Sequence, residues 1–182
     1  MNSQTATMQV AIIDRLVLVK ITGRATFNTS PAFKDLVAGL QQRGYHAFAL
    51  ELSDCPLMDS TFLGVLAGLA LKVAESGTGD CLIQLLNATP RILDLLDNLG
   101  VSHLFGICSQ PVPDFTKFES VPANATAPTK EQVSRTCLEA HELLMAINPD
   151  NIPKFKDVTR FLAEDLKKIT GADPGSPGET KT

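Results

Sequence analysis

Hydrophobic positions divide the first 109 residues into short strand-like runs that alternate with helical stripes. Gln9–Ile13 and Leu16–Gly23 are β-rich runs on either side of Asp14-Arg15, which predicts a hairpin. Three further apolar runs predict strands, at Ala47–Leu52, Cys81–Leu86 and Leu104–Ile107. The first of these three has no polar alternation, so we expect it to be the most buried strand, near the middle of a sheet.

Between these strands, three segments carry apolar residues at helical spacing. Thr29-Ser30-Pro31 and Thr89-Pro90 each place a hydroxyl cap before a proline whose missing N–H costs little at a helix start. The first and third helices end near Gly44 and Gly100, and the second runs from Ser60 to about Glu75. The order β-β-α-β-α-β-α-β predicts an α/β fold with a mixed, mostly parallel sheet of about five strands joined by helices.

The chain divides into four segments on this pattern. Residues 1–109 form the α/β domain, and residues 110–128 contain prolines at 111, 113, 122 and 128, which predict a stiff linker without regular structure. Residues 129–170 predict two helices, and the Gly/Pro/Ser-rich tail 171–182 is expected to be disordered.

The predicted helical extension begins with a capping box, Thr129…Gln132. A continuous apolar seam follows, made of Val133, Cys137, Ala140, Leu144 and Ile147. A second stripe runs from Phe155 to Ile169. Because such seams must be buried, we expect the helices to fold back onto the α/β domain or to pair with each other. A homodimer formed through these C-terminal helices is the alternative.

Composition excludes several classes of function. The net charge is −4 with no Trp and one Tyr, so the chain lacks the clustered basic and aromatic residues of a nucleic-acid surface. No basic segment followed by an apolar stretch indicates a signal peptide, and the most apolar run, Phe62–Leu71, is about half the length of a membrane span. The four isolated cysteines fit reduced thiols, so we predict a cytoplasmic protein that does not insert into membranes.

Candidate chemistry is concentrated at Asp59-Ser60, where a loop after a buried strand opens a helix. A serine at this point is expected to be exposed, close to the unpaired N–H groups and positive dipole end of the helix, where a phosphate is well tolerated. Adding a phosphate beside Asp59 would repel an acidic partner surface. The structural alternative is that both residues only cap the helix, since Asp and Ser are common caps.

These residues carry a resemblance to a known family. Asp59, Ser60, Thr61, Leu63 and Gly64 match the strand–loop–Asp-Ser-[Ser/Thr]-Gly-Leu–helix hallmark of the STAS domains of bacterial anti-sigma-factor antagonists. The resemblance covers roughly residues 8–108. It implies a STAS fold and a partner-switching binding module.

The same resemblance implies a role for each residue of the motif. Ser60 is the implied phosphorylation site of an anti-sigma factor serine kinase, and Asp59 is its required neighbour. The partner-binding residues are Asp59, Ser60, Thr61 and Phe62, although Phe62 stands where the family usually has a small residue. Unphosphorylated protein would bind the anti-sigma factor, and a metal-dependent serine phosphatase would reset the switch.

Two other functions stay open beside this one. The family contains accessory subunits of ABC-type membrane transporters, which are not phosphorylated. An enzyme is disfavoured, because neither a nucleophile–base set nor metal-ligand spacing emerges among His46, His103, His141 and the cysteines. We therefore predict no catalytic residue, metal or cofactor. Gly64 and Gly68 form a G-x-x-x-G pattern, which we expect to pack closely against the sheet.

Overall fold

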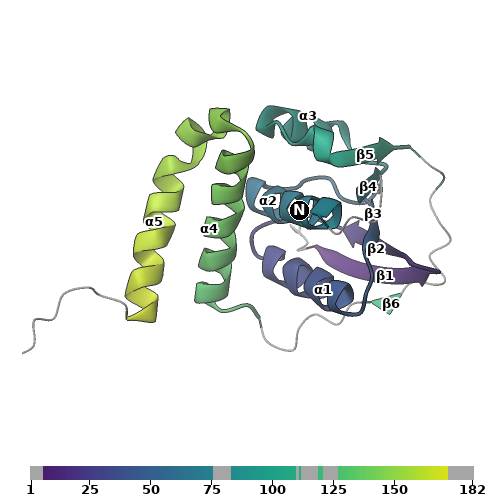
Figure 1. The fold of residues 1–182 in the computed structure, drawn as a ribbon, viewed down its shortest axis with the longest axis horizontal. Helices are drawn as coiled ribbons and strands as arrows, with labels where there is room; N and C mark the ends of the chain where they lie inside the picture. Colours follow the sequence, from purple (N-terminus) through teal and green to yellow (C-terminus); the bar gives the residue numbers. More distant parts are fainter. Residues whose placement is uncertain (1–5, 76–82, 110, 112–118, 121–126, 172–182) are drawn as a thin grey trace, which may run out of the picture.

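The computed structural model describes residues 6–75, 83–109, 111, 119–120 and 127–171 (Figure 1). The strands are β1 (Thr7–Ile13), β2 (Leu16–Thr22), β3 (Ala47–Glu51), β4 (Ile83–Leu86), β5 (Phe105–Cys108) and β6 (Glu119–Ser120). The helices are α1 (Ser30–Gln42), α2 (Ser60–Glu75), α3 (Pro90–Leu99), α4 (Lys130–Ile147) and α5 (Ile152–Thr170). Two 3-10 turns, η1 (Ser102–Leu104) and η3 (Pro149–Asn151), lie before β5 and α5.

The strands form one mixed sheet in the order β5-β4-β3-β2-β1-β6. β1 and β2 are an antiparallel hairpin, and β2 to β5 are parallel neighbours, which confirms the predicted α/β fold. β3 lies in the interior of the sheet, as its unbroken apolar run predicted. One expectation was wrong: β6 lies in the linker predicted to lack regular structure, where residues 119–120 pair with Gln9 and Val10 of β1.

The elements are arranged in layers, which Figure 1 shows from the side. α1, α2 and α3 lie against the sheet, α4 lies beyond them, and α5 is outermost. The core between the sheet and the first helices is dry, with Val19, Leu50, Phe62 and Leu66 all fully buried. This burial is the main stabilising contribution to the α/β domain.

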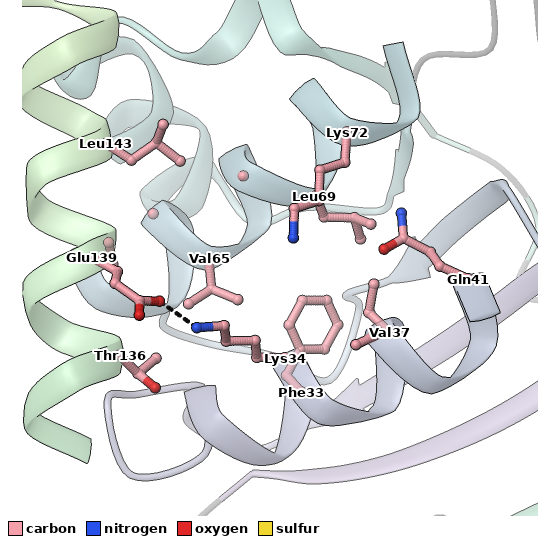
Figure 2. Close-up of a pocket in the computed structure, with 14 residues that line it drawn as sticks. Phe33, Lys34, Val37, Gln41, Val65, Leu69, Lys72, Thr136, Glu139 and Leu143 are labelled. Atoms are coloured by element: carbon pink, nitrogen blue, oxygen red, sulfur yellow. Dashed lines mark hydrogen bonds and ion pairs between the residues drawn. The ribbon is translucent and has the colours of Figure 1, made fainter. Parts of the chain in front are cut away.

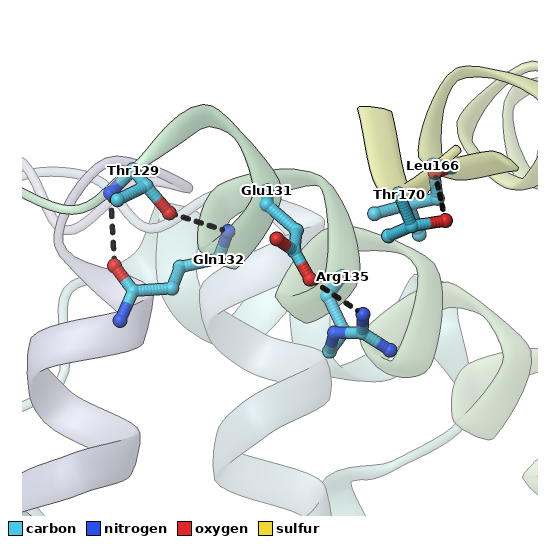
Figure 3. A network of polar contacts seen from close by, with 6 residues as sticks. All are labelled: Thr129, Glu131, Gln132, Arg135, Leu166 and Thr170. Carbon is cyan, nitrogen blue, oxygen red and sulfur yellow. Dashed lines mark hydrogen bonds and ion pairs between the residues drawn. The ribbon is translucent and has the colours of Figure 1, made fainter. Parts of the chain in front are cut away.

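Most of the predicted helix caps are present. The Thr129 hydroxyl accepts a hydrogen bond from the Gln132 N–H at 3.2 Å, and the Gln132 side chain accepts one from the Thr129 N–H at 2.8 Å (Figure 3). Thr89 caps α3 in the expected way, and Gly100 ends it with φ 70°. Thr29 is different, because its hydroxyl bonds to the backbone of Thr26 and leaves the start of α1 uncapped by a side chain.

The C-terminal helices fold back onto the α/β domain and also pair with each other, so both parts of that expectation are confirmed. Cys137, Ala140 and Leu144 of the predicted seam are buried. The turn between α4 and α5 is fixed to the end of α3. The fully buried Asn151 side chain donates to the Leu99 carbonyl at 2.9 Å and to the Leu144 carbonyl at 3.0 Å.

Several predicted features lie outside the described residues. They are most of the Pro-rich linker, the turn at residues 76–80 with the start of the fourth strand, and the tail from residue 172. Among the helices described here, none combines the length and apolarity needed to cross a membrane.

Candidate functional site

Asp59 occupies the cap position of α2, directly before Ser60. Its carboxylate accepts hydrogen bonds from the Phe62 N–H at 2.9 Å and the Phe27 N–H at 2.7 Å. Its own N–H donates to the Ala25 carbonyl at 3.1 Å. Asp59 therefore caps the helix and also ties the β2–α1 connection to it, so the capping interpretation holds for this residue whatever else it does.

Ser60 is the first residue of α2, as predicted, but its hydroxyl does not project freely into solvent. Its Oγ lies 2.9 Å from Nε2 of His141, which α4 places over the start of α2. The Ser60 side chain is half-buried, and the contact joins residues 81 positions apart in the chain. The hydroxyl is thus partly covered by the helical extension, where we expected it to be open.

Thr61 and Phe62 are both buried, but on different faces of α2. Phe62 is fully buried, with its ring 4.9 Å from that of Phe33, and Thr61 donates to the Cys137 sulfur at 3.6 Å beneath α4. We expected both side chains on a partner-binding surface, but Phe62 lies in the core, whereas Thr61 lies on the face of α2 that α4 covers. Phe62 fills the core, since the third residue of the helix points in a different direction from Ser60.

The seat of α4 on α2 depends on a glycine. A Cβ added to Gly64 would lie 2.7 Å from both the Cβ and the carbonyl oxygen of Ala140. Because such distances are not tolerated, only glycine lets the two helices approach this closely. A Cβ on Gly68 would meet Leu143 at 3.1 Å. The G-x-x-x-G pattern therefore packs against α4, and our expectation that it packs on the sheet was wrong.

A cavity of about 290 Å³ lies between α1, α2 and α4 (Figure 2). Its walls are mainly apolar, and Figure 2 shows Phe33, Val65 and Leu143 around it. At one side, Lys34 of α1 forms an ion pair with Glu139 of α4. The contact between α4 and the α/β domain is therefore close at Gly64 and open beside it.

His141 is buried in an environment that disfavours its charged form. Burial lowers the pKa of the imidazole below the ordinary 6.5, although the Cys137 carbonyl and the negative charge of Asp59 oppose the shift. The ring stacks against Phe155 of α5, with centroids 4.6 Å apart. Its Nδ1 is buried without a hydrogen bond of ordinary geometry in the described part of the chain, which costs about 1–3 kcal/mol.

The Ser60–His141 contact has the geometry of a nucleophile and a general base, but its surroundings do not fit catalysis. No carboxylate orients Nδ1 within the described residues, and the oxygens of Asp59 are already bonded to two backbone N–H groups. The nearby cavity is lined by neither Ser60 nor His141. Across the same described ranges, no three His, Cys, Asp or Glu side chains are grouped to hold a metal.

His141 is the residue that sequence reasoning missed. Its position next to Ala140 on the seam of α4 was the available signal, because a seam that folds back must bring its neighbours with it. The spacing of the apolar residues in the seam does not show which surface of the α/β domain the seam covers. The close approach of Gly64 to Ala140 is one of the contacts that fix the register in which His141 lies on Ser60.

The α/β domain resembles known proteins in its sequence and fold. The STAS domain family model matches residues 7–114, so α4 and α5 lie outside the match. A Thermotoga maritima protein assigned as an anti-sigma factor antagonist is 21% identical at a TM-score of 0.50, over 58% of this chain and 87% of its own. An anti-sigma factor antagonist from Mycobacterium paratuberculosis is 18% identical at 0.50, over 63% and 92%. These likenesses show the fold. No curated protein matched the chain.

Proposed function

Because this chain belongs to the STAS domain family, we propose that it is a phospho-switchable antagonist of an anti-sigma factor. With Ser60 unphosphorylated, the surface at the start of α2 binds a kinase-type anti-sigma factor. Phosphorylation of Ser60 by that partner releases it, and a metal-dependent serine phosphatase restores the binding form. The chain acts in the cytoplasm as a binding module, without catalysis or a cofactor of its own.

The observation that supports this proposal most directly is the position of Ser60. It is the first residue of α2, it follows the interior strand β3, and its hydroxyl lies at the outer end of the helix, away from the dry core. A phosphate there would lie near the unpaired N–H groups of the first turn. It would also add about two negative charges next to Asp59, enough to block close docking of a partner.

The test uses the full chain and each serine-kinase-type anti-sigma factor of the source organism, supplied with ATP. Intact-mass analysis should find one phosphate, mapped to Ser60 by peptide fragmentation. Ser60→Ala should take up none, while Ser109→Ala, a change at an exposed serine after β5, should behave as the parent.

Binding to the same partner should separate two further variants. Ser60→Ala should keep the affinity of the unmodified chain, and Ser60→Asp should bind at least about tenfold more weakly, because a charge is added to the docking surface. Equal affinities for the two variants, or a phosphate mapped elsewhere, would contradict the proposal.

The alternative within the family is an accessory subunit of an ABC-type membrane transporter. Such a subunit would bind the transporter ATPase and would carry no phosphate. The intact mass of the protein isolated from its native cells distinguishes the two, since a phosphorylated fraction supports the switch and its lasting absence supports the accessory role.

Pairing of two chains, if it occurs, would use α5. α4 is enclosed between α2 and α5, whereas α5 leaves Phe161 60% exposed with Val158 and Ile169 each 38% exposed. Light scattering should then report a dimer that Phe161→Ser dissociates. If the chain stays monomeric at high concentration, α5 serves only to cover α4.

A further inference from the structure

Resting on the function proposed above, we propose that α4 is a built-in competitor for the Ser60 surface. In the resting chain α4 occupies the surface around Ser60. The kinase-type anti-sigma factor reaches this surface only when α4 moves away. The structure carries this inference through three observations: what α4 covers, how it is seated, and how it is held.

What α4 covers is the motif itself. His141 lies on Ser60, and Cys137 lies on Thr61, so that successive turns of α4 close over the first turn of α2. A protein kinase needs the serine hydroxyl free to meet ATP, and a hydroxyl bonded to a buried imidazole is not free. Phosphorylation and docking of α4 are therefore mutually exclusive at this serine.

The contact between α4 and α2 is packed less completely than the main core. At the Ser60 motif its contact with α2 is made by small or polar side chains such as Thr61, Gly64 and Ala140, and a cavity remains alongside. Only further along the helix does Leu144 reach the main core. The buried Nδ1 of His141 lacks a hydrogen bond of ordinary geometry among the described residues, and water would supply one if the helix left. Departure of α4 thus recovers solvation that the docked state lacks.

How α4 is held makes the competition effective. The segment 121–129 between β6 and α4 spans at most roughly 30 Å when extended, so α4 stays close to its seat after release. A tethered competitor acts at an effective concentration in the millimolar range. A partner must therefore have a high intrinsic affinity for this surface in order to displace α4. Its apparent affinity for the intact chain is weaker than that intrinsic affinity.

The seat also indicates the kind of partner that replaces α4. The close approach at Gly64 accepts a helix only with a small residue in the place of Ala140. Lys34, paired with Glu139, would accept an acidic side chain one position earlier. A helix of the partner carrying an acidic residue followed by Ala or Gly fits these two requirements.

The test compares two glycine substitutions in the full chain. Gly64→Ala places a Cβ against Ala140, whereas a Cβ at Gly39 of α1 meets nothing within 4 Å, so Gly39→Ala is the matched control. Hydrogen–deuterium exchange should be at least about tenfold faster in α4 of Gly64→Ala, with the strands still protected. Alkylation of Cys137, located by peptide mapping, should accelerate in parallel. Gly39→Ala should behave as the parent.

Two results would overturn the inference. One is unchanged exchange of α4 in Gly64→Ala. The other is loss of protection in α4 and the strands together, which would make α4 part of one cooperative unit.

Phosphorylation then separates this inference from the function on which it rests. A kinase-type anti-sigma factor should phosphorylate Ser60 at least about tenfold faster in Ala140→Leu than in the parent, because the larger side chain displaces α4 from Gly64 and leaves the surface of α2 unchanged for the partner. Equal rates would refute the competition while leaving the switch intact. If α4 opens as expected and no such kinase phosphorylates either protein, the proposed switch is wrong, whereas the covering of Ser60 by α4 still holds.

Discussion

The two faces of α2 are built in different ways. Toward the sheet, α2 presents large apolar side chains such as Phe62, Leu63 and Leu66, all fully buried in the main core. Toward α4, it presents Ser60, Thr61 and Gly64, which make close or polar contacts. One face gains its stability from apolar area, and the other from precise fit.

This difference indicates what each face is for. Apolar burial is insensitive to small shifts and holds the α/β domain together. A fit that depends on one absent Cβ and one hydroxyl–imidazole bond is lost as soon as the helices move slightly apart. The face toward α4 is therefore the one from which a packed helix separates more readily.

The largest effect is expected from the face toward the sheet. Phe62→Ala should lower the free energy of unfolding by about 3–5 kcal/mol, because it removes a fully buried ring that packs on Phe33. Thermal or denaturant unfolding measures this loss. Phe27→Ala is the control, since that side chain is 44% exposed, and it should cost far less. Comparable losses for the two would contradict the assignment of the loss to the burial of Phe62 in the core.

A smaller effect is expected where the extension is fixed to the end of α3. Asn151→Ala removes the buried donor that joins the carbonyls of Leu99 and Leu144, which keep their bonds from Asn148, and should cost about 1–3 kcal/mol. The loss should fall on α4 and α5, so hydrogen exchange there should rise before exchange in the strands. The exposed Asp150, next in sequence, provides a control as Asp150→Ala. Equal exchange in helices and strands would show that the extension does not open by itself.

The same contrast explains how much of the protein could be predicted from its sequence. The sheet, its interior strand β3 and the start of α2 at Ser60 all follow from apolar runs and caps, which depend on neighbours in the chain. The capping box at Thr129 was predicted for the same reason. β6 was not, since a two-residue strand is defined by its pairing with β1 and carries no pattern of its own.

The candidate site was predicted only in part, because its cover comes from elsewhere in the chain. Asp59-Ser60 stood out locally, but the residue on Ser60 is supplied by α4, and no periodicity states which surface a seam will cover. Phe62 was expected at the surface because the motif was taken as one unit. In a helix, successive residues point in different directions, so the residue two positions after Ser60 turns into the core.

Acidification should weaken the docking of α4 on α2 and leave the contact between α2 and the sheet unchanged. The pKa of His141 is lowered by burial, so the docked state binds fewer protons than the released state. Docking is therefore strongest above the ordinary pKa of 6.5 and weakens as the pH falls below it. The ring is faced by the Ser60 hydroxyl, Asp59, the Cys137 carbonyl and Phe155, and the charge of Asp59 limits the size of the effect.

An NMR titration tests this pH dependence. The His141 ring should titrate below 6.5, and the resonances of α4 should shift with it while those of the strands stay unchanged. His141→Gln cannot be protonated in this range and should remove the dependence. Persistence of the α4 shifts in that variant would assign them to another group.

The smallest effect is expected on the outer surface of α4, at the Glu131–Arg135 ion pair (Figure 3). The two side chains are 43% and 52% exposed and one turn apart, so the pair contributes about 0.3–0.5 kcal/mol to the helix and nothing to its seat. Arg135→Ala should therefore change the exchange rate of α4 by no more than about twofold, and the change should vanish at high salt. This variant tests whether α4 opens by leaving α2 or by losing its own helical structure. If Arg135→Ala opens α4 as much as Gly64→Ala does, helix formation limits the opening and the fit at Gly64 does not. If only Gly64→Ala opens it, the contact with α2 controls access to Ser60, and α4 leaves that surface as an intact helix.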